Sequence, residues 1–263
     1  AGNTKLPIAQ DDKDTIRKEL KAHHPDWLGV FYELGISTGH RTNDLASLTW
    51  DCISFEEHSL TVVVSKQTKS AQSRAYNRGF KEIRANRQAE AMAAGDAGAF
   101  MRWANADHDQ LLASASNDER YRLNQLIASV EPKIDRKRLS PELVARLAAM
   151  KEKAFWGDQW VFSRALTLSN STRLESGHHI TRQTVWARFK AVFAAVAELV
   201  ENSQKLSAYS LRKTYAFSIY LLTGRLAAVT QALGHAGEKV TLRYLGLDNE
   251  AEKAQIELVG GTA

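Results

Sequence analysis

Apolar residues recur along most of this chain at the three- and four-residue intervals of a helix. Between residues 16 and 34 this spacing predicts two helices, separated by the HHPD segment at 23–26. It also predicts a helix from Thr42 to Trp50 and a long helix whose apolar face runs through 185–200. Residues 140–142, Ser-Pro-Glu, begin another helix with a capping side chain and a first-turn proline.

One stretch is rich in β-forming residues instead. Residues 52–55 and 60–64 favour strands, and the polar residues 56–59 between them favour a turn. The sequence therefore predicts a mainly α fold with a small antiparallel β-hairpin or sheet, of the α+β class.

The stretch of about 75–131 has a different composition, rich in Ala, Arg, Asn, Asp and Gln with few large apolar residues. Its residues still favour helix by propensity, so we expect an inserted helical subdomain. Residues 169–181 are predicted to form a polar loop.

Composition narrows the class of protein. The 263 residues are 44% hydrophobic and 25% charged, with no apolar run that would span a membrane and no secretory leader pattern at the start. The single cysteine, Cys52, excludes an internal disulfide framework, and no Cys/His spacing fits a zinc site. A net charge of +5 and a pI near 9.2 permit a polyanionic partner. We expect a reduced, cytoplasmic protein.

Three polar clusters could carry chemistry. In the first, Gly39 permits a tight link between two helices and places Arg41 at the start of the second, where a guanidinium can grip a phosphate. The plainer interpretation is a surface arginine paired with Asp44. In the second cluster, Tyr209 and Arg212 are three residues apart and share a helical face, as they would in an ordinary amphipathic helix too.

The third cluster lies near the C-terminus. Gly234 is typical of a helix end, which leaves His235 on a turn, and Tyr244 follows nine residues later on a short helix. Taken singly, the histidine could be a structural hydrogen-bonding group and the tyrosine a core or surface residue.

Taken together and in this order, the clusters resemble the tyrosine recombinase (phage integrase) family. The matching segments are TGHRTNDLASLTWDCI at 38–53, YSLRKTYA at 209–216 and LGHAGEKVTLRYLGL at 233–247. The resemblance covers most of 5–75 and 132–258, and KIDRKRLSPELVARL resembles the family's third strand and following helix. It implies the tyrosine recombinase catalytic-domain fold over 5–247, interrupted by the helical insertion at about 75–131 and followed by a helical tail at 248–263.

The resemblance implies a site-specific recombinase that cleaves and rejoins DNA without a metal or cofactor. Tyr244 would attack a phosphate and form a 3′-phosphotyrosyl link. Arg41 and Arg212 would clamp the charged oxygens of the transition state, His235 would donate a hydrogen bond, and Asp44 would steady the site.

Two positions are less regular. The family's hairpin lysine, which protonates the leaving 5′-oxygen, corresponds to Lys69, with Lys66 as its rival. Tyr209 occupies the position where the family usually has a histidine, and a phenol with a pKa near ~10 is a poor base at neutral pH. The alternative is therefore a regulatory or architectural DNA-binding protein that keeps the fold without cleavage. A basic helical protein with no DNA role is a third interpretation.

The resemblance also implies partners and a setting. These are double-stranded DNA at specific sites, a tetrameric synapse formed on DNA from monomers, and accessory DNA-bending proteins, with no membrane. The job would be integration, excision or plasmid multimer resolution, in a mobile-element setting, at the nucleoid of a prokaryotic or phage system. Arg41 comes so early that we expect no separate N-terminal core-binding domain in this chain, which fits a minimal recombinase or a catalytic fragment.

Overall fold

The computed structural model describes residues 5–167 and 177–247. The chain divides into two compact units, one formed by Ala1–Thr61 with Arg136–Ala263 and the other by Val62–Asp135. The expected tail at 248–263 and part of the expected polar loop at 169–181 lie outside the described residues.

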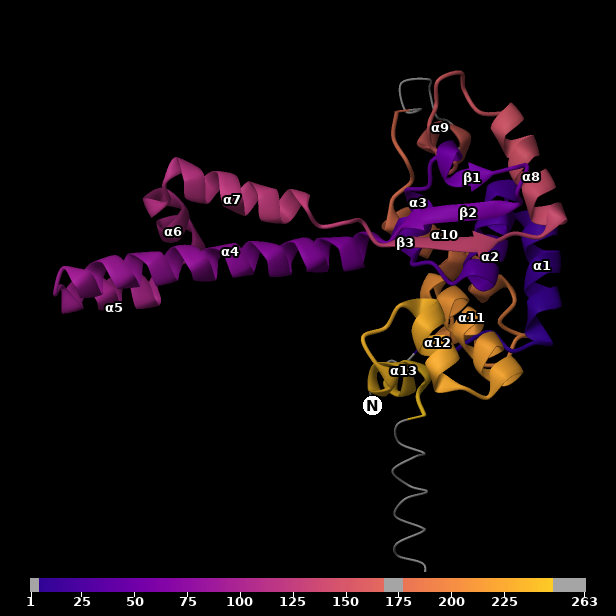
Figure 1. Cartoon of the computed structure of the whole chain (residues 1–263). Helices are drawn as coiled ribbons and strands as arrows, with labels where there is room; N and C mark the ends of the chain where they lie inside the picture. The colour runs from indigo at the N-terminus through magenta and orange to yellow at the C-terminus, as the bar shows by residue number, and fades with distance from the viewer. Residues whose placement is uncertain (1–4, 168–176, 248–263) are drawn as a thin grey trace, which may run out of the picture. The chain divides into compact units, whose positions relative to one another are not determined.

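The first unit is a helical body around one small sheet (Figure 1). Its elements are α1 (Asp12–His23), α2 (Asp26–Thr38), α3 (Thr42–Ala46), η1 (Trp50–Cys52), β1 (Ile53–Ser54), β2 (Ser59–Val63), β3 (Ile134–Arg138), α8 (Pro141–Glu152), α9 (Arg164–Thr167), α10 (Arg182–Ala195), η3 (Ser203–Lys205), α11 (Ala208–Thr223), α12 (Leu226–Leu233) and α13 (Glu238–Leu245). The central helix is α2, which is buried over most of its length and packs against α1, α8 and α11. Its Phe31 ring meets Phe162 at 4.9 Å and Phe189 at 6.0 Å, which joins the core side of α10 to α2.

The sheet confirms the predicted α+β class. Strands β1 and β2 pair antiparallel in the register Ile53↔Leu60 and Ser54↔Ser59, and β3 lies on the other side of β2. The turn between β1 and β2 places His58 at a φ of 48°, and the Glu57 backbone N–H donates to Ser54 Oγ.

Two predicted helices are shorter than expected. The helix predicted to reach Trp50 ends at Ala46, because the following backbone pairs elsewhere: Trp50 N–H donates to Gln159 O at 2.9 Å, and Val161 N–H donates to Leu48 O. The helix predicted through 185–200 ends at Ala195, and turns complete its apolar stretch. Pairing with a distant segment thus ends the first helix, whereas the second passes into local turns, such as the bond from Val200 N–H to Val196 O.

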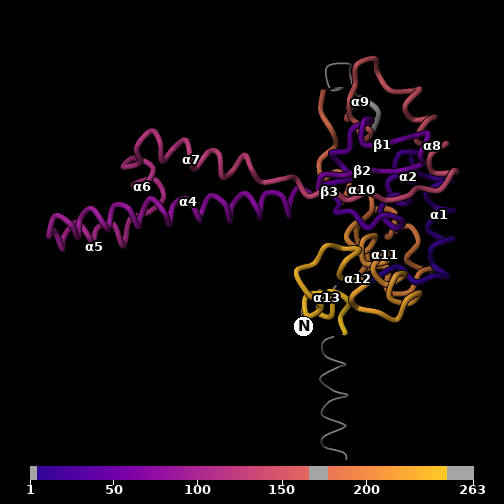
Figure 2. Tube along the Cα trace, viewed as in Figure 1, coloured from indigo at the N-terminus to yellow at the C-terminus, as the bar shows by residue number. Residues whose placement is uncertain are grey.

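The second unit is entirely helical apart from its strand ends. It consists of α4 (Ser65–Ala93), α5 (Ala97–Asn105), α6 (His108–Ser114) and α7 (Asn117–Ala128). Figure 2 shows the shorter helices folded back along the long helix α4. The side chains of Asp96, Asp107 and Ser116 cap the three short helices. The residues of its separate core are Phe80, Ile83, Ala106, Leu111, Ala115 and Leu123. The expected insertion at about 75–131 lies within this unit.

The second unit begins and ends at one place. Val64 N–H, just after β2, donates to Lys133 O, just before β3, at 2.7 Å, and Lys133 N–H donates to Thr68 Oγ1. The unit therefore stands in the sequence where two adjacent strands would otherwise be joined by a turn. Within the described ranges, no helix is long and apolar enough to cross a membrane.

Candidate active site

Arg212 is the most tightly held of the predicted residues. Ser207 caps the start of α11 by accepting from Tyr209 N–H, and one turn later Arg212 lies buried, with 7% of its surface exposed. Its Nη1 donates to Gly39 O at 2.6 Å and its Nη2 to Leu233 O at 2.9 Å. Burial lowers the pKa of Arg212, and the nearby charge of Arg41 lowers it further, yet a guanidinium stays protonated in proteins.

The link between α2 and α3 is shaped by Gly39. This residue has a φ of 67°, and a β-carbon at this position would lie 2.1 Å from Cδ1 of Tyr215. Both the left-handed backbone and the packed ring require glycine here. The turn presents the Gly39 carbonyl to Arg212 and carries the chain on to Arg41, which precedes the first residue of α3.

Arg41 and Asp44 form a loose pair within one helical turn. Arg41 Nη1 lies 3.9 Å from Asp44 Oδ2, too far for a hydrogen bond, while the two side chains are 27% and 3% exposed. Among the described residues, Arg41 Nη1 has no hydrogen-bond partner although the atom is buried. Asp44 therefore orients the guanidinium electrostatically and leaves a donor that can serve an anion.

His235 lies on the turn after α12, as predicted, because α12 ends at Gly234 in the left-handed conformation. Its Nδ1 is 3.1 Å from Thr241 Oγ1, and Thr241 Oγ1 is 2.8 Å from Thr230 Oγ1. Thr241 is fully buried on α13, so this hydroxyl fixes the plane of the imidazole.

Tyr244 lies at the centre of the group. Its ring meets His235 at 5.1 Å and Tyr209 at 5.6 Å between centroids, and Lys213 Nζ lies 5.7 Å from its ring centre. The Tyr244 hydroxyl is buried and has no hydrogen-bond partner of good geometry among the described residues. Burial raises the pKa of Tyr244 well above its ordinary value, and Tyr209 raises it further while Arg212 opposes the rise. The phenol is therefore protonated at neutral pH.

Six predicted residues thus belong to one unit and are linked by ring contacts or by electrostatic interactions: Arg41, Asp44, Tyr209, Arg212, His235 and Tyr244. Next to them is a hollow of about 510 Å³ whose lining includes Thr42, Tyr209, Arg182, Trp186 and Lys5. Its rim is cationic and aromatic, which suits a nucleic acid strand.

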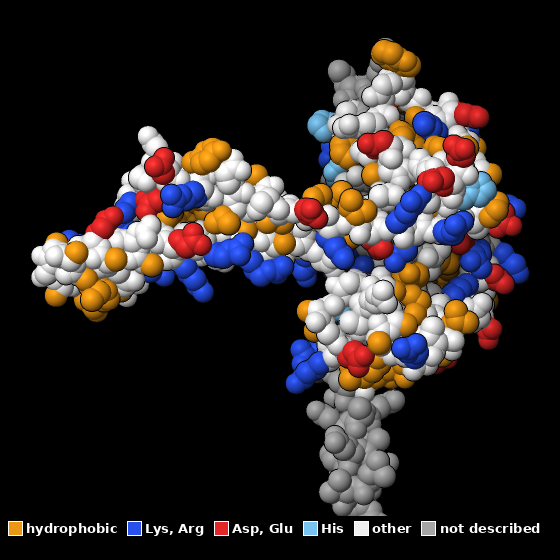
Figure 3. Space-filling model, viewed as in Figure 1, with side chains coloured by type: hydrophobic (Ala, Val, Ile, Leu, Met, Phe, Trp, Pro, Cys, Tyr) orange, Lys and Arg blue, Asp and Glu red, His pale blue; other side chains and the backbone are white. Residues whose placement is uncertain are grey.

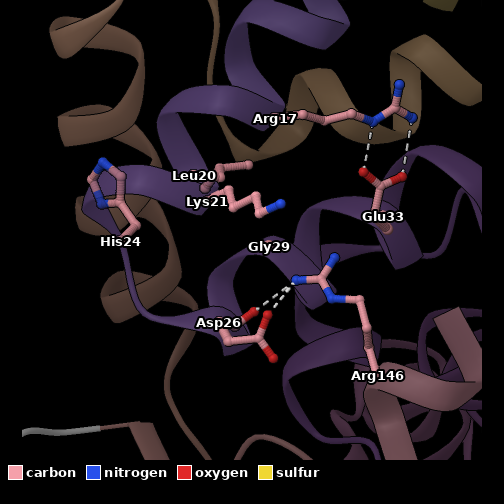
Figure 4. A pocket seen from close by; sticks show the side chains of 8 residues that line it. All are labelled: Arg17, Leu20, Lys21, His24, Asp26, Gly29, Glu33 and Arg146. Atoms are coloured by element: carbon pink, nitrogen blue, oxygen red, sulfur yellow. Dashed lines mark hydrogen bonds and ion pairs between the residues drawn. The ribbon is translucent and has the colours of Figure 1, made fainter. Parts of the chain in front are cut away.

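A second hollow, of about 370 Å³, has a different character (Figure 4). Arg17 donates to both carboxylate oxygens of Glu33, at 2.8 and 3.1 Å, and Arg146 pairs with Asp26 at 2.5 Å. Carboxylates therefore pair with both arginines of this hollow between α1, α2 and α8, which distinguishes them from Arg41, whose pair with Asp44 is loose.

Lys69 and Lys66 were expected on the hairpin, and this placement is wrong. Helical hydrogen bonds begin directly after β2, with Thr68 N–H donating to Val64 O at 3.0 Å, so both lysines lie at the start of α4 in the second unit. Their assignment as general acid stays a prediction.

Sequence reasoning missed Thr241 and Lys213. Thr241 precedes Tyr244 by three residues on one helix, a spacing that could have indicated a shared face. Lys213 directly follows Arg212, and only the packing of α13 on α11 brings it beneath the Tyr244 ring.

A profile of the phage integrase family matches residues 8–251. The chain belongs to this family. The resemblance seen in the three motifs is therefore confirmed. The amino-acid sequence of this chain is similar to that of the probable integrase/recombinase YoeC of Bacillus subtilis (strain 168). The two are 29% identical over 58 residues, which are 22% of this chain and 32% of that protein.

Similar solved structures support the tyrosine recombinase fold. The XerA recombinase matches 98% of this chain with a TM-score of 0.53 at 12% identity, and 66% of its own chain is covered. The Tn1549 transposon integrase in complex with transposon right-end DNA matches 97% with a TM-score of 0.53 at 10% identity, again covering 66% of that chain. The XerH recombinase bound to difH substrate matches 98% with a TM-score of 0.52 at 11% identity and 55% coverage. This family member thus spans less than two thirds of the length of these relatives.

Proposed function

We propose that this phage integrase family member is a site-specific DNA recombinase that works through a 3′-phosphotyrosyl intermediate. The observation that carries the proposal is Tyr244, a phenol held between His235 and Tyr209 beside the buried cation of Arg212. A buried hydroxyl that has no hydrogen-bond partner in the described part of the chain, next to positive charge, suits attack on a bound anion.

The chemistry follows from these positions. Tyr244 Oη attacks the phosphorus, the bond to the 5′-oxygen breaks, and a covalent phosphotyrosine forms. Charge that develops on the non-bridging oxygens is stabilised by Arg41 and Arg212, and His235 donates a hydrogen bond there. The leaving 5′-oxygen takes a proton from Lys69, or from its rival Lys66. A strand's 5′-hydroxyl then reverses these steps and restores the diester.

Tyr209 would act as a proton relay at the position where the family usually has a histidine. The proton of Tyr244 has to leave during attack, and the half-exposed Tyr209 phenol beside it can pass a proton to solvent. Because a phenol is a weak base, we expect a slow chemical step.

The natural substrate would be double-stranded DNA carrying specific sites. The chain would be a monomer in solution and assemble on DNA into a tetrameric synapse, with accessory DNA-bending proteins, at the nucleoid of a prokaryotic or phage system. The outcome would be integration, excision or plasmid multimer resolution. Solved structures of the Tn1549 integrase with transposon-end DNA and of XerH with its difH substrate are consistent with a DNA partner.

A second candidate function is DNA binding without cleavage. It is favoured by Tyr209 at the histidine position and by the raised pKa of Tyr244, which together make the nucleophile hard to deprotonate.

A suicide-substrate assay separates the two. Nicked duplexes carrying candidate sites from the DNA that encodes the protein are incubated with wild type, Tyr244→Phe and a matched control, Tyr121→Phe, whose ring is exposed on α7. A denaturation-resistant adduct with wild type and Tyr121→Phe, absent with Tyr244→Phe, supports the recombinase. Salt-dependent binding without any adduct would favour the non-cleaving protein.

A further inference from the structure

The charges of the second unit are divided between its helices. The long helix α4 has seven lysine and arginine residues against two acidic ones, whereas residues 94–135 have four against seven. The first acidic residue of α4 is Glu82, so the charged side chains in the preceding part of this helix are all cations.

Four of these cations lie toward one side of α4. Arg74, Arg78 and Lys81 follow at intervals of four and three residues, which places them on one face, and Lys66 comes eight residues earlier near the same face. All four are exposed, and we call them the basic face. Figure 3 shows Lys and Arg side chains in a row along one side of α4.

The remaining arginines of α4 have a different task. Arg84 donates to Ala106 O at 2.7 Å, and Arg87 donates to Ser114 O and to Glu119 at 2.6 Å, so both hold the shorter helices against α4. The core residues Phe80 and Ile83 lie on this inner side. The basic face is therefore not needed to build the unit.

Within the described residues, no member of the basic face has a carboxylate partner; Arg74 donates to the Ser70 hydroxyl instead. Like charges four residues apart destabilise a helix, and lysines in a first turn oppose the helix dipole. A face that serves only solubility would mix both signs. Unpaired cations in one row complement a polyanion.

We infer that the basic face of α4 binds the phosphate backbone of double-stranded DNA. The partner's identity as DNA rests on the proposed function, while its polyanionic chemistry rests on the charges above. From Lys66 to Lys81 the helix rises about 22 Å, a length over which one strand of a duplex presents about six phosphates. The contacts carry no base recognition, so they strengthen binding to all sequences equally.

The test removes the charges that the catalytic proposal does not use. Wild type is compared with two triple variants, each of which loses three exposed cations of the second unit. The α4 variant is Arg74→Gln/Arg78→Gln/Lys81→Gln, and the control is Arg102→Gln/Arg122→Gln/Lys133→Gln. Dissociation constants for a duplex of arbitrary sequence are measured over a series of salt concentrations. We expect the slope of log K against log salt to fall by about 2.7 for the α4 variant, so that doubling the salt costs wild type about sixfold more affinity than the variant. The control keeps the wild-type slope.

An unchanged slope for the α4 variant overturns the inference, as does an equal fall in the control. A wild-type chain that binds no duplex overturns it too. If the α4 variant alters self-association in sedimentation but not the DNA slope, the face binds an acidic protein surface instead. The charge-retaining variant Arg74→Lys/Arg78→Lys has to keep the slope, which separates lost charge from altered folding.

The outcome is separable from that of the proposed function. Adduct formation by wild type tests the recombinase, whereas the slope tests α4. If wild type forms the adduct and the α4 variant keeps the wild-type salt slope, the recombinase proposal stands and the inference about the basic face fails. If wild type forms no adduct but the α4 variant shows a reduced salt slope, the inference about the basic face stands and the recombinase proposal fails.

Discussion

Thr241 Oγ1 lies 3.1 Å from His235 Nδ1 and completes a chain of hydroxyls that begins at Thr230. The Thr241 hydroxyl can donate to Nδ1 or accept from it, and in either case the contact holds the imidazole ring in one orientation. The ring is thereby held beside Tyr244, with 5.1 Å between the two ring centroids. Thr241 thus acts on the chemistry through His235 as a positioning residue.

Replacing Thr241 by Val removes this hydroxyl while keeping the shape of the side chain. We expect adduct formation to slow by about tenfold to a hundredfold, less than the loss of a group that transfers the proton itself, because Thr241 acts only through His235, with an unchanged dissociation constant for DNA. Thr241→Ser restores the rate because it restores the hydroxyl. Single-turnover kinetics on the nicked duplex measure both. Equal rates for Val and wild type would show that the contact does not orient His235 for catalysis.

The two arginines should respond differently to a lysine. Arg212 satisfies two buried carbonyls, so Arg212→Lys lowers the free energy of unfolding by about 1–3 kcal/mol as well as abolishing cleavage. Arg41 makes only a loose pair, so Arg41→Lys leaves stability within about 0.5 kcal/mol of wild type and slows cleavage by about a hundredfold or more. Denaturant unfolding measures the stability of both variants, and adduct kinetics measure their cleavage rates. A destabilised Arg41→Lys would contradict this division of roles.

Stability at high pH should depend on Tyr244. The pKa of the folded-state phenol is raised, so the folded chain keeps a proton that the unfolded chain loses above pH about 10. The stabilisation is complete below that pH and declines as pH rises. Tyr244→Phe should therefore flatten the fall of unfolding free energy between pH 10 and 11.5, by up to about 1.4 kcal/mol per pH unit. Tyr121→Phe, at an exposed position, should not. Parallel curves for wild type and Tyr244→Phe would mean that the phenol is solvated.

Gly39→Ala should be more costly than a glycine replacement in open space. At Gly39 both the positive φ and the Tyr215 ring oppose a β-carbon, whereas Gly157 has a φ of 80° and nothing within 4 Å. We expect about 1–2 kcal/mol of lost stability at Gly157, from backbone strain alone, and a distinctly larger loss at Gly39. Thermal unfolding of the two variants gives the comparison. Equal losses would mean that Tyr215 moves aside freely.

Much of the site could be predicted because short motifs carry their own local structure. Gly234 ends α12 and places His235 on a turn, and the spacing of Tyr209 and Arg212 needs only the helix that Ser207 caps. The link at Gly39 follows similarly from its conformational freedom. These features depend on a few neighbouring residues, so they can be predicted from the local sequence alone.

Contacts between secondary-structure elements that are distant in the chain could not be predicted from the sequence. Helix α3 ends early because 159–161 pairs with the chain after it, and Lys66 and Lys69 lie on α4 because helical bonding starts at Val64. The hydroxyl of Thr241 matters only once α12 and α13 are packed together. Such pairings depend on partners distant in the chain, which local periodicity does not encode.

The bond from Val64 N–H to Lys133 O also has a consequence for how the chain could be shortened. A segment whose two ends already meet can be exchanged for a tight turn without moving either flanking strand. The entropy of closing a loop grows only slowly with its length, by about 0.6 kcal/mol for each doubling, so closing the ends of this long segment costs only about 2–3 kcal/mol more than closing a turn of a few residues. The first and second units are, in this thermodynamic sense, separable parts, and a chain trimmed to a short turn between β2 and β3 should still fold.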